Sequence, residues 1–302
     1  MINTPYVVVF GSINYDIIFK QQRLPLIGET YTSDSVFFGS GGKGANQAVQ
    51  CAKLGAKTFM VGKVGNDVFG NQLLETISCC EVDVSNIKRS DINTGIGVDN
   101  ILYDGSLYAT ISTGANFDFT TDDVEEYEEL IKKAGIIILQ MEIPTKVNER
   151  IIHEAAEHGV YIILNGAPAK EISREALKLV NCFIVNEPEA SFYVGYEIKD
   201  FDSALQHYKK LLAMVKDTLI ITLGSNGSVI CSGSDFDFVR PFPVETIGDT
   251  VGAGDSYIGA YAVKKLSGEN DLAACNFASK AAAFTVSSFG AQPAMPFLRD
   301  IE

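Results

Sequence analysis

The sequence DTVGAGD at residues 249–255 carries more information than any other stretch of this chain. Two glycines and a small residue stand directly before a carboxylate, Asp255, at the start of a helix predicted over Ser256 to Leu266. Free backbone N–H groups at a helix N-terminus bind anionic groups. The pattern therefore predicts a hole for a phosphoryl group, with Asp255 placed to accept a proton from an attacking hydroxyl. An ordinary glycine-rich turn capped by Asp255 is the alternative interpretation.

A second glycine-rich cluster, GSGGKGANQA at residues 39–48, runs from a predicted strand into a helix predicted over Ala45 to Leu54. It satisfies G-x-G-x-x-G, the pattern of a dinucleotide site. However, the next predicted strand does not end in the acidic residue that would hold a ribose hydroxyl. A phosphate-binding P-loop would need Ser or Thr after Lys43. We interpret the cluster as a loop whose backbone closely approaches a polyhydroxyl ligand, with Lys43 and Asn46 as polar side chains.

Together the two clusters resemble the signatures of the ribokinase family of sugar kinases, also called the PfkB family. GGKGANQA at residues 41–48 is similar to the N-terminal signature, and residues 249–255 are similar to the C-terminal one. The resemblance extends over essentially the whole chain. Further matching segments follow in family order at residues 11–16, 114–116, 186–189, 222–224 and 290–293.

The fold class follows from alternating apolar runs and helical patterns. The chain has 302 residues, 46% of them hydrophobic, which is enough for one large α/β core and a small appendage. Near-continuous apolar runs predict strands at Val7 to Phe10, Ile136 to Leu139, Val160 to Leu164, Cys182 to Val185 and Thr218 to Thr222. Helical patterns between them include Asp122 to Ala134, Lys146 to His158 and Ser203 to Val215. The alternation predicts a three-layer α/β/α domain with a mainly parallel central sheet, whose ligand crevice lies at the carboxyl ends of the strands.

Two β-rich stretches interrupt this alternation and predict a small discontinuous β lid at residues 14–38 and 94–112. Residues 1–13, 39–93 and 113–302 then form the α/β domain that binds nucleotide and sugar, and the resemblance implies the same division. An open edge of the lid sheet also predicts a homodimer through the lid.

Polar residues after two predicted strands are the candidate sugar ligands. Asn14 and Asp16 follow the first strand, and Glu142 follows the strand that ends at Leu139. A strand-terminating turn is the alternative role for Asn14 and Asp16. The resemblance implies that all three bind sugar hydroxyls. It implies the same for Gly41, Gly42, Lys43 and Asn46, with Asp255 as the general base and the amides of Gly252, Ala253 and Gly254 as the anion hole.

The resemblance also implies ATP as co-substrate, Mg²⁺, and a monovalent cation, K⁺. It places Asn186 and Glu189 near the phosphates and the magnesium ion. The positions expected around the nucleotide are Thr222, Gly224, Ser225, Gly227, Gly254 and Ser279, the last on a helix predicted over Asp271 to Ser287. A plain hairpin turn remains the alternative for residues 222–227. The positions that match the family's cation loop are Asp249, Val251, Thr285, Ser288 and Gly290.

The choice of sugar depends on charge. No Lys or Arg occurs between Arg89 and Lys132, so the second half of the lid offers nothing to a phosphate group. We therefore expect neutral ribose to be phosphorylated on its 5-hydroxyl. A kinase for deoxyribose, a hexose or a nucleoside stays open, and the intact Asp255 argues against a sugar-binding regulator without activity. Two departures from the family are polar groups at Asp99-Asn100 in a lid strand and Gly166 in place of a proline.

Charge and cysteine usage limit the partners and the location. The net charge of −14 argues against nucleic acid or an anionic membrane as a partner. No apolar run reaches the length that spans a bilayer. Six cysteines show no metal-binding spacing, so we expect reduced core thiols in a cytoplasmic protein. For the adjacent pair Cys79-Cys80 we favour packing over a redox role.

Overall fold

The computed structural model describes residues 5–104 and 106–302. Its main sheet has nine strands in the order β13-β12-β11-β10-β9-β8-β1-β4-β5. Neighbouring strands from β5 to β11 run parallel, while β12 and β13 are added as antiparallel strands at one edge. The strands are β1 (Val7–Phe10), β4 (Thr58–Gly65), β5 (Asp83–Ser90), β8 (Ile136–Leu139), β9 (Tyr161–Asn165), β10 (Cys182–Val185), β11 (Thr218–Thr222), β12 (Ser228–Ser232) and β13 (Asp235–Val239). The predicted mainly parallel sheet is confirmed.

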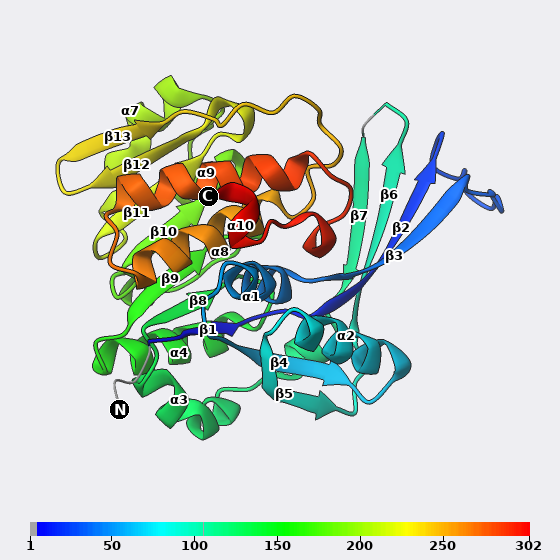
Figure 1. Cartoon of the computed structure of the whole chain (residues 1–302), viewed down its shortest axis with the longest axis horizontal. Coiled ribbons are helices and arrows are strands. Elements are labelled where there is room, and N and C mark those ends of the chain that lie inside the picture. Colours follow the sequence, from blue (N-terminus) through cyan, green and yellow to red (C-terminus); the bar gives the residue numbers. More distant parts are fainter. Residues whose placement is uncertain (1–4, 105) are drawn as a thin grey trace.

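Helices cover both faces of this sheet and make three layers (Figure 1). The alternation of side chains along β1 shows why: Val8 and Phe10 belong to one buried cluster, and Val7 and Val9 belong to the other. The first cluster includes residues of α4 and α7, and the second includes residues of α1, α8 and α9. The helices are α1 (Lys43–Lys53), α2 (Val68–Cys79), α3 (Glu128–Lys132), α4 (Thr145–Glu157), α5 (Arg174–Leu177), α6 (Glu187–Val194), α7 (Phe201–Leu212), α8 (Ala253–Leu266), α9 (Asp271–Val286) and α10 (Leu298–Ile301).

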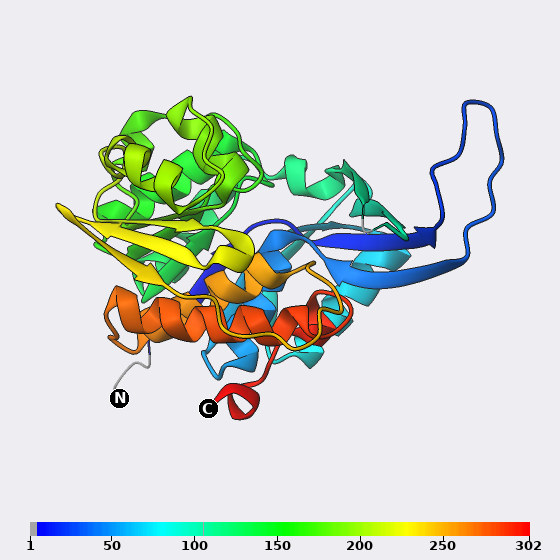
Figure 2. The same cartoon turned by 90° about the horizontal axis from the view of Figure 1, so that it is seen from above.

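A second, four-stranded sheet projects from one side of the α/β layers (Figures 1 and 2). Its order is β3-β2-β6-β7, and its strands are β2 (Asn14–Gln21), β3 (Ser35–Gly41), β6 (Gly95–Leu102) and β7 (Leu107–Ser112). The β2–β3 and β6–β7 pairs are antiparallel, and the central β2–β6 pair is parallel. The small sheet is thus built from two segments that are distant in the sequence, as predicted.

Some element boundaries differ from the predictions, for local reasons. Strand β3 continues to Gly41, and α1 begins at Lys43 rather than Ala45, because Gly42 makes the whole turn with φ of 87°. The predicted helix over Asp122 to Ala134 is instead a 3₁₀ segment, Asp122–Tyr127, followed by the short α3. Carboxylates three and four residues apart in this segment repel one another on an α-helix.

The structure shows the surroundings of Gly166 and of the six cysteines. A Cβ on Gly166 would lie 2.8 Å from Val185 Cγ1 and 3.0 Å from Tyr193 Cε2, so packed side chains fill the place of the family's proline. All six cysteines are free, and Cys51, Cys182, Cys231 and Cys275 are buried. Across the described ranges, no helix is long and apolar enough to cross a membrane.

Candidate active site

The amino end of α8 is the centre of the candidate site. Gly252 caps this helix with φ of 79°, a left-handed conformation that favours glycine, and α8 begins at Ala253, before the predicted start at Ser256. The backbone N–H groups of Gly252 and Gly254 have no hydrogen-bond partner within residues 5–104 and 106–302. These donors and the positive end of the helix dipole are therefore free to hold an anion.

Asp255 is buried in the first turn of α8, and two amide side chains of α1 hold its carboxylate. Asn46 Nδ2 donates to Oδ2 over 2.9 Å, and Gln47 Nε2 donates to Oδ1 over 2.8 Å. Gln292 Nε2 donates to Asn46 Oδ1 over 3.0 Å, and Gln140 Nε2 donates to Gln47 Oε1 over 2.7 Å. Since these outer bonds fix both amide groups, each presents its donor to Asp255.

Lys43 lies among the carboxylates of the site. Burial lowers the pKa of Lys43, but Asp255, Glu142, Glu189 and Asp16 together raise it by more. In turn, burial raises the pKa of Asp255, against the opposing effects of Lys43 and of the hydrogen bonds it accepts. Lys43 therefore stays charged at neutral pH, and Asp255 binds a proton more readily than an exposed aspartate does.

Asp16 projects from β2 into a space that glycines leave open. A Cβ on Gly97 would lie 2.5 Å from Asp16 Oδ1, and a Cβ on Gly41 would overlap the same carboxylate. Burial raises the pKa of Asp16 to about 7, and the other carboxylates of the site, Asp99 first among them, add to the shift. The small sheet thus brings an acidic group with a near-neutral pKa toward Glu142 and Asp255.

The two remaining polar candidates for the sugar are held by neighbours. Asn116 Nδ2 donates to Asn14 Oδ1 over 2.7 Å, which leaves the Asn14 amide N–H groups for a ligand. Glu142 Oε2 accepts from Ser12 Oγ over 2.5 Å and from the backbone N–H of Lys43 over 3.1 Å. One carboxylate oxygen of Glu142 is thus tied to the α1 turn, and the other stays available.

The glycines of the first cluster have a packing role. A Cβ on Gly42 would lie 2.8 Å from the backbone nitrogen of Asn14, and a Cβ on Gly44 would lie 2.7 Å from the backbone carbon of Gly11. These glycines let the start of α1 pack on the chain that leaves β1. Their contacts explain how Asn46 and Lys43 reach the site, and the close approach of the glycine backbone to a ligand stays a prediction.

The expected nucleotide residues lie at the carboxyl ends of β10 and β11. Asn186 and Glu189 form a capping box at the start of α6, in which Asn186 Oδ1 accepts from Glu189 N (3.0 Å) and Glu189 Oε2 accepts from Asn186 N (2.9 Å). Burial raises the pKa of Glu189, and the negative charge of Glu189 contributes to the raised pKa of Lys43. Thr222 ends β11, and Gly224, Ser225 and Gly227 make the turn to the antiparallel β12, so this turn is a hairpin at the same edge of the sheet.

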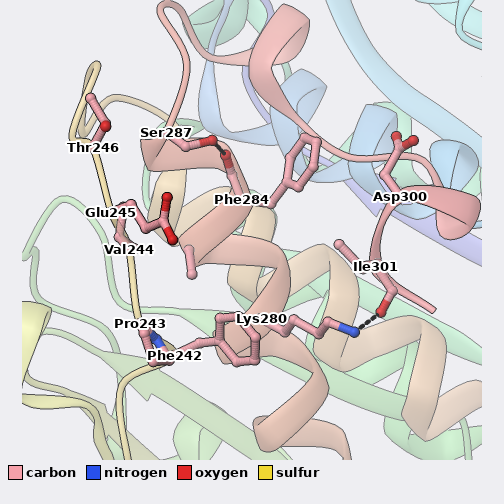
Figure 3. Close-up of a pocket in the computed structure, with 11 residues that line it drawn as sticks. Phe242, Pro243, Val244, Glu245, Thr246, Lys280, Phe284, Ser287, Asp300 and Ile301 are labelled. Atoms are coloured by element: carbon pink, nitrogen blue, oxygen red, sulfur yellow. Dashed lines mark hydrogen bonds between the residues drawn. The ribbon is translucent and has the colours of Figure 1, made fainter.

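Ser279 fastens the chain that follows β13 to α9. Its Oγ accepts from Phe242 N over 3.2 Å and contacts the carbonyl of Arg240 at 3.4 Å. Beside it, a pocket of about 370 Å³ lies between the loop from Phe242 to Thr246, the outer side of α9 and the end of α10 (Figure 3). Asp255 is not among the lining residues. The pocket is large enough for a small ligand but is separate from the carboxylate cluster.

Asp249 links the two segments of the expected cation loop by hydrogen bonds. Its Oδ1 accepts from Val251 N over 3.0 Å, and its Oδ2 accepts from Gly290 N over 3.3 Å, so one carboxylate joins the two loops that flank α8 and α9. The buried Thr285 hydroxyl is 2.8 Å from Ser256 Oγ. The Thr285 hydroxyl also donates to the carbonyl of Ala281 over 3.0 Å, so it is engaged within the protein.

The sequence predicted most of these site residues but not the amide side chains that orient them. Gln47, Gln140 and Gln292 were not assigned a role, although two of them stand inside the quoted motifs. Asn116, which orients Asn14, also lies in a quoted segment. Gln47 follows Asn46 and Gln140 lies two positions before Glu142, so closeness to a predicted sugar-binding residue is the signal for these two, whereas Gln292 has no such signal.

Comparisons with known proteins identify the family of the chain. The profile of the family described as pfkB family carbohydrate kinase matches residues 4–298. A ribokinase of Bacillus subtilis is 34% identical over 296 residues, which cover 98% of each chain. A ribokinase of Mus musculus is 34% identical and covers 98% of this chain and 93% of its own length. Among solved structures, Arabidopsis thaliana ribokinase complexed with ribose and ATP superposes with a TM-score of 0.91 at 32% identity, covering 99% of this chain and 98% of the other.

Proposed function

The chain belongs to the pfkB family of carbohydrate kinases, and we propose that it transfers the γ-phosphoryl group of ATP to the 5-hydroxyl of D-ribose, giving ribose 5-phosphate and ADP. The observation that carries the proposal is the buried Asp255 at the free amino end of α8, oriented by Asn46 and Gln47. A base next to unpaired amides is the arrangement that in-line phosphoryl transfer needs.

Asp255 acts as the general base in this proposal. As the sugar oxygen bonds to the γ-phosphorus, its proton passes to the Asp255 carboxylate. The bond from the γ-phosphorus to the bridging oxygen breaks, and its electron pair stays on the β-phosphate of ADP. The unpaired amides of Gly252 and Gly254 face the charge that develops on the phosphoryl oxygens, and the amide of Ala253, which donates to Thr250 O over a long 3.4 Å, is the third expected member of this hole. The raised pKa of Asp255 favours proton acceptance in this buried setting.

The sugar-binding groups favour a neutral substrate. Asp16 and Glu142 offer carboxylate oxygens to hydroxyl donors, Asn14 and Asn46 offer amides, and Lys43 is the cation among them. A phosphate on the substrate would have to sit near several carboxylates, which Coulomb repulsion disfavours. We therefore assign ribose rather than a phosphosugar, with Gly41 and Gly42 serving to shape the site.

The nucleotide is proposed to lie along the carboxyl ends of β10 and β11. Glu189 is a buried carboxylate with one oxygen outside the capping box, and such a group suits Mg²⁺, which binds one or two carboxylates and keeps several waters. Magnesium, when bound, would neutralise charge on the transferred phosphate. Asn186 would hold the phosphates. The adenosine would lie against Thr222, Gly224, Ser225, Gly227 and Ser279.

We also propose a monovalent cation site next to the anion hole. The loop carboxylate of Asp249 and the carbonyls of residues 251, 285, 288 and 290 are oxygen donors, which suit K⁺. Bound there, K⁺ would fix the loop that precedes Gly252 and so the direction of the anion-hole amides.

The small sheet is proposed to act as a lid, with residues 14–38 and 94–112 in the lid and residues 1–13, 39–93 and 113–302 in the main domain. The rings of Phe37 on β3 and Phe289 lie 4.9 Å apart, so the lid already contacts the chain after α9. Dimerisation through the lid and a cytoplasmic location stay predictions.

The test is a coupled ADP-release assay across ribose, 2-deoxyribose, hexoses, nucleosides and fructose 6-phosphate, with the product identified by mass and NMR. We expect the highest kcat/KM for ribose and phosphorylation of its 5-hydroxyl. A higher kcat/KM for a phosphosugar or a nucleoside would remove ribose from the proposal and leave the kinase assignment in place. Absence of ADP release with every acceptor would favour a sugar-binding regulator.

A further inference from the structure

The small sheet turns one defined face toward the active site. In the parallel β2–β6 pair, Asp16 is opposite Gly97 and Ile18 is opposite Asp99. Side chains alternate along strands, so these four residues share a face. This is the face toward the active site, because the carboxylates of Glu142 and Asp255 act on that of Asp16, whereas Tyr15 on the opposite face packs against Phe69 of α2.

Asp99 occupies the next position on this inner face beyond the Asp16 pocket. Its neighbours across β6 are Ile18 on β2 and Ala109 on β7, and Gly97 precedes it on the same face. None of these three residues can form a side-chain hydrogen bond or ion pair with the Asp99 carboxylate. The carboxylate is half-buried, and in the described part of the chain no hydrogen bond or ion pair involves it.

The charges that Asp99 meets are of its own sign. Burial raises the pKa of Asp99, and Asp249, in the loop that leads to α8, adds to that shift. Asp99 in turn raises the pKa of Asp16. Its carboxylate therefore shares the inner face of the sheet with that of Asp16 and carries the same charge as its acidic neighbours. A half-buried carboxylate that faces other carboxylates gains most from a hydrogen-bond donor supplied by a ligand.

We propose that Asp99 is a specificity-determining residue, which accepts a hydrogen bond from one hydroxyl of the sugar and so selects sugars that carry this hydroxyl over the matching deoxy analogue. The inference rests on the proposed function. On β6, Asp99 lies two positions, ~6.6 Å, beyond Gly97, which pairs with Asp16 on the neighbouring strand, so Asp16 and Asp99 contact different hydroxyls of one sugar. An analogue that lacks the partner of Asp99 leaves a desolvated carboxylate unpaired, and sites of this kind reject such analogues strongly.

The experiment measures kcat/KM for ribose, 2-deoxyribose, 3-deoxyribose and 1,4-anhydroribitol, which lacks the anomeric hydroxyl. The enzymes are the wild type, Asp99→Ala, Asp99→Asn and the control Asn100→Ala. Asn100 is the next residue on β6, points to the opposite face, and accepts from Gln21 Nε2 over 3.0 Å. Its truncation disturbs the same strand without changing the inner face.

We expect the wild type to reject one deoxy analogue by roughly tenfold to a hundredfold, as for loss of a hydrogen bond to a charged group. Asp99→Ala should lower kcat/KM for ribose by that factor and leave kcat/KM for the rejected analogue unchanged, so that the selectivity disappears. Asp99→Asn, which keeps an acceptor oxygen without the charge, should retain part of it. Asn100→Ala should keep the wild-type selectivity.

An equal fall in kcat/KM for ribose and for all the analogues, in both Asp99 variants, would overturn the inference. Unchanged selectivity in these variants would overturn it as well. Loss of K⁺ activation with unchanged sugar selectivity would also overturn it and would assign Asp99 to the cation loop. If Asp99→Ala does not fold, the nearly isosteric Asp99→Asn decides, with sugar affinity measured by calorimetry without ATP. If the wild type prefers another sugar to ribose, the proposed substrate fails, and the same variants are compared on that sugar and its deoxy analogues.

Discussion

Replacing Asp255 with Asn is the most direct test of the proposed chemistry. The substitution removes the proton acceptor but keeps the shape of the side chain, the amides of Gly252 and Gly254 and the sugar-binding groups. Loss of a positioned general base costs about 10²- to 10⁴-fold in rate. This range corresponds to roughly 2.7–5.5 kcal/mol of activation free energy. We therefore expect kcat to fall by two to four orders of magnitude.

Asp255→Asn should also change the free energy of unfolding. Asn46 and Gln47 each donate to a different oxygen of Asp255, and Gln292 and Gln140 hold both amides in that orientation. An Asn at position 255 accepts only one of these bonds, and its own N–H₂ then faces the other donor. A buried unsatisfied donor costs ~1–3 kcal/mol. Burial disfavours the charged carboxylate and so raises the pKa of Asp255. Replacing it with a neutral amide therefore offsets part of this cost.

The assay is ADP release at saturating ribose and ATP, together with thermal unfolding and calorimetric binding of ribose. The control is Asp271→Asn. Asp271 starts α9 near the amino end of β11, where it accepts from Tyr261 (2.8 Å) and Thr218 (2.9 Å). This control should unfold at lower temperature and keep a kcat close to that of the wild type. A folded Asp255→Asn enzyme with near-wild-type kcat would refute the assignment of Asp255 as the base.

The parts of the fold that could be predicted depend on local patterns. The apolar runs at Val7–Phe10, Ile136–Leu139, Cys182–Val185 and Thr218–Thr222 became the strands β1, β8, β10 and β11, because strands buried on both faces need apolar residues at consecutive positions. The segment that begins at Asp122 does not form the single predicted helix, because its apolar spacing favours a helix while repulsion among its carboxylates opposes one.

The candidate site was predictable only where a motif is continuous. Asp255 and Asn46 stand in glycine-rich stretches with a recognisable order, so both could be proposed before any geometry was known. The hydrogen bond from Gln292 to Asn46 joins residues that are 246 positions apart. The electrostatic effect of Asp249 on Asp99 depends on how the small sheet is placed relative to the loop before α8. Neither interaction leaves a local pattern, because the tertiary arrangement alone creates it.

Three further predictions concern the cation, the lid and pH. K⁺ should raise kcat well above the rate in Na⁺ alone. Asp249→Ala should remove the difference, because Asp249 joins the two loops that flank the anion hole. Equal rates in both salts for the wild type would contradict the cation site. Gly97→Ala should raise KM for ribose more than it lowers kcat, since its Cβ would lie 2.5 Å from Asp16 Oδ1; an unchanged KM would place the sugar elsewhere. The last prediction follows from the pKa of Asp16, which burial and the nearby carboxylates raise to about 7. A raised pKa means that the folded protein binds the proton more tightly than the unfolded chain, so the contribution of Asp16 to folding stability is present at acid pH and is lost as pH rises through about 7. Ribose binding has the opposite sign, because only the ionised carboxylate accepts hydrogen bonds through both oxygens. We expect kcat/KM to rise between about pH 5.5 and about pH 8.5 with an apparent pKa near 7, since this ratio reports the free enzyme. In Asp16→Asn that limb of the profile should disappear while a lower kcat/KM remains, and a profile that kept its limb near pH 7 in this variant would assign the titration to another carboxylate.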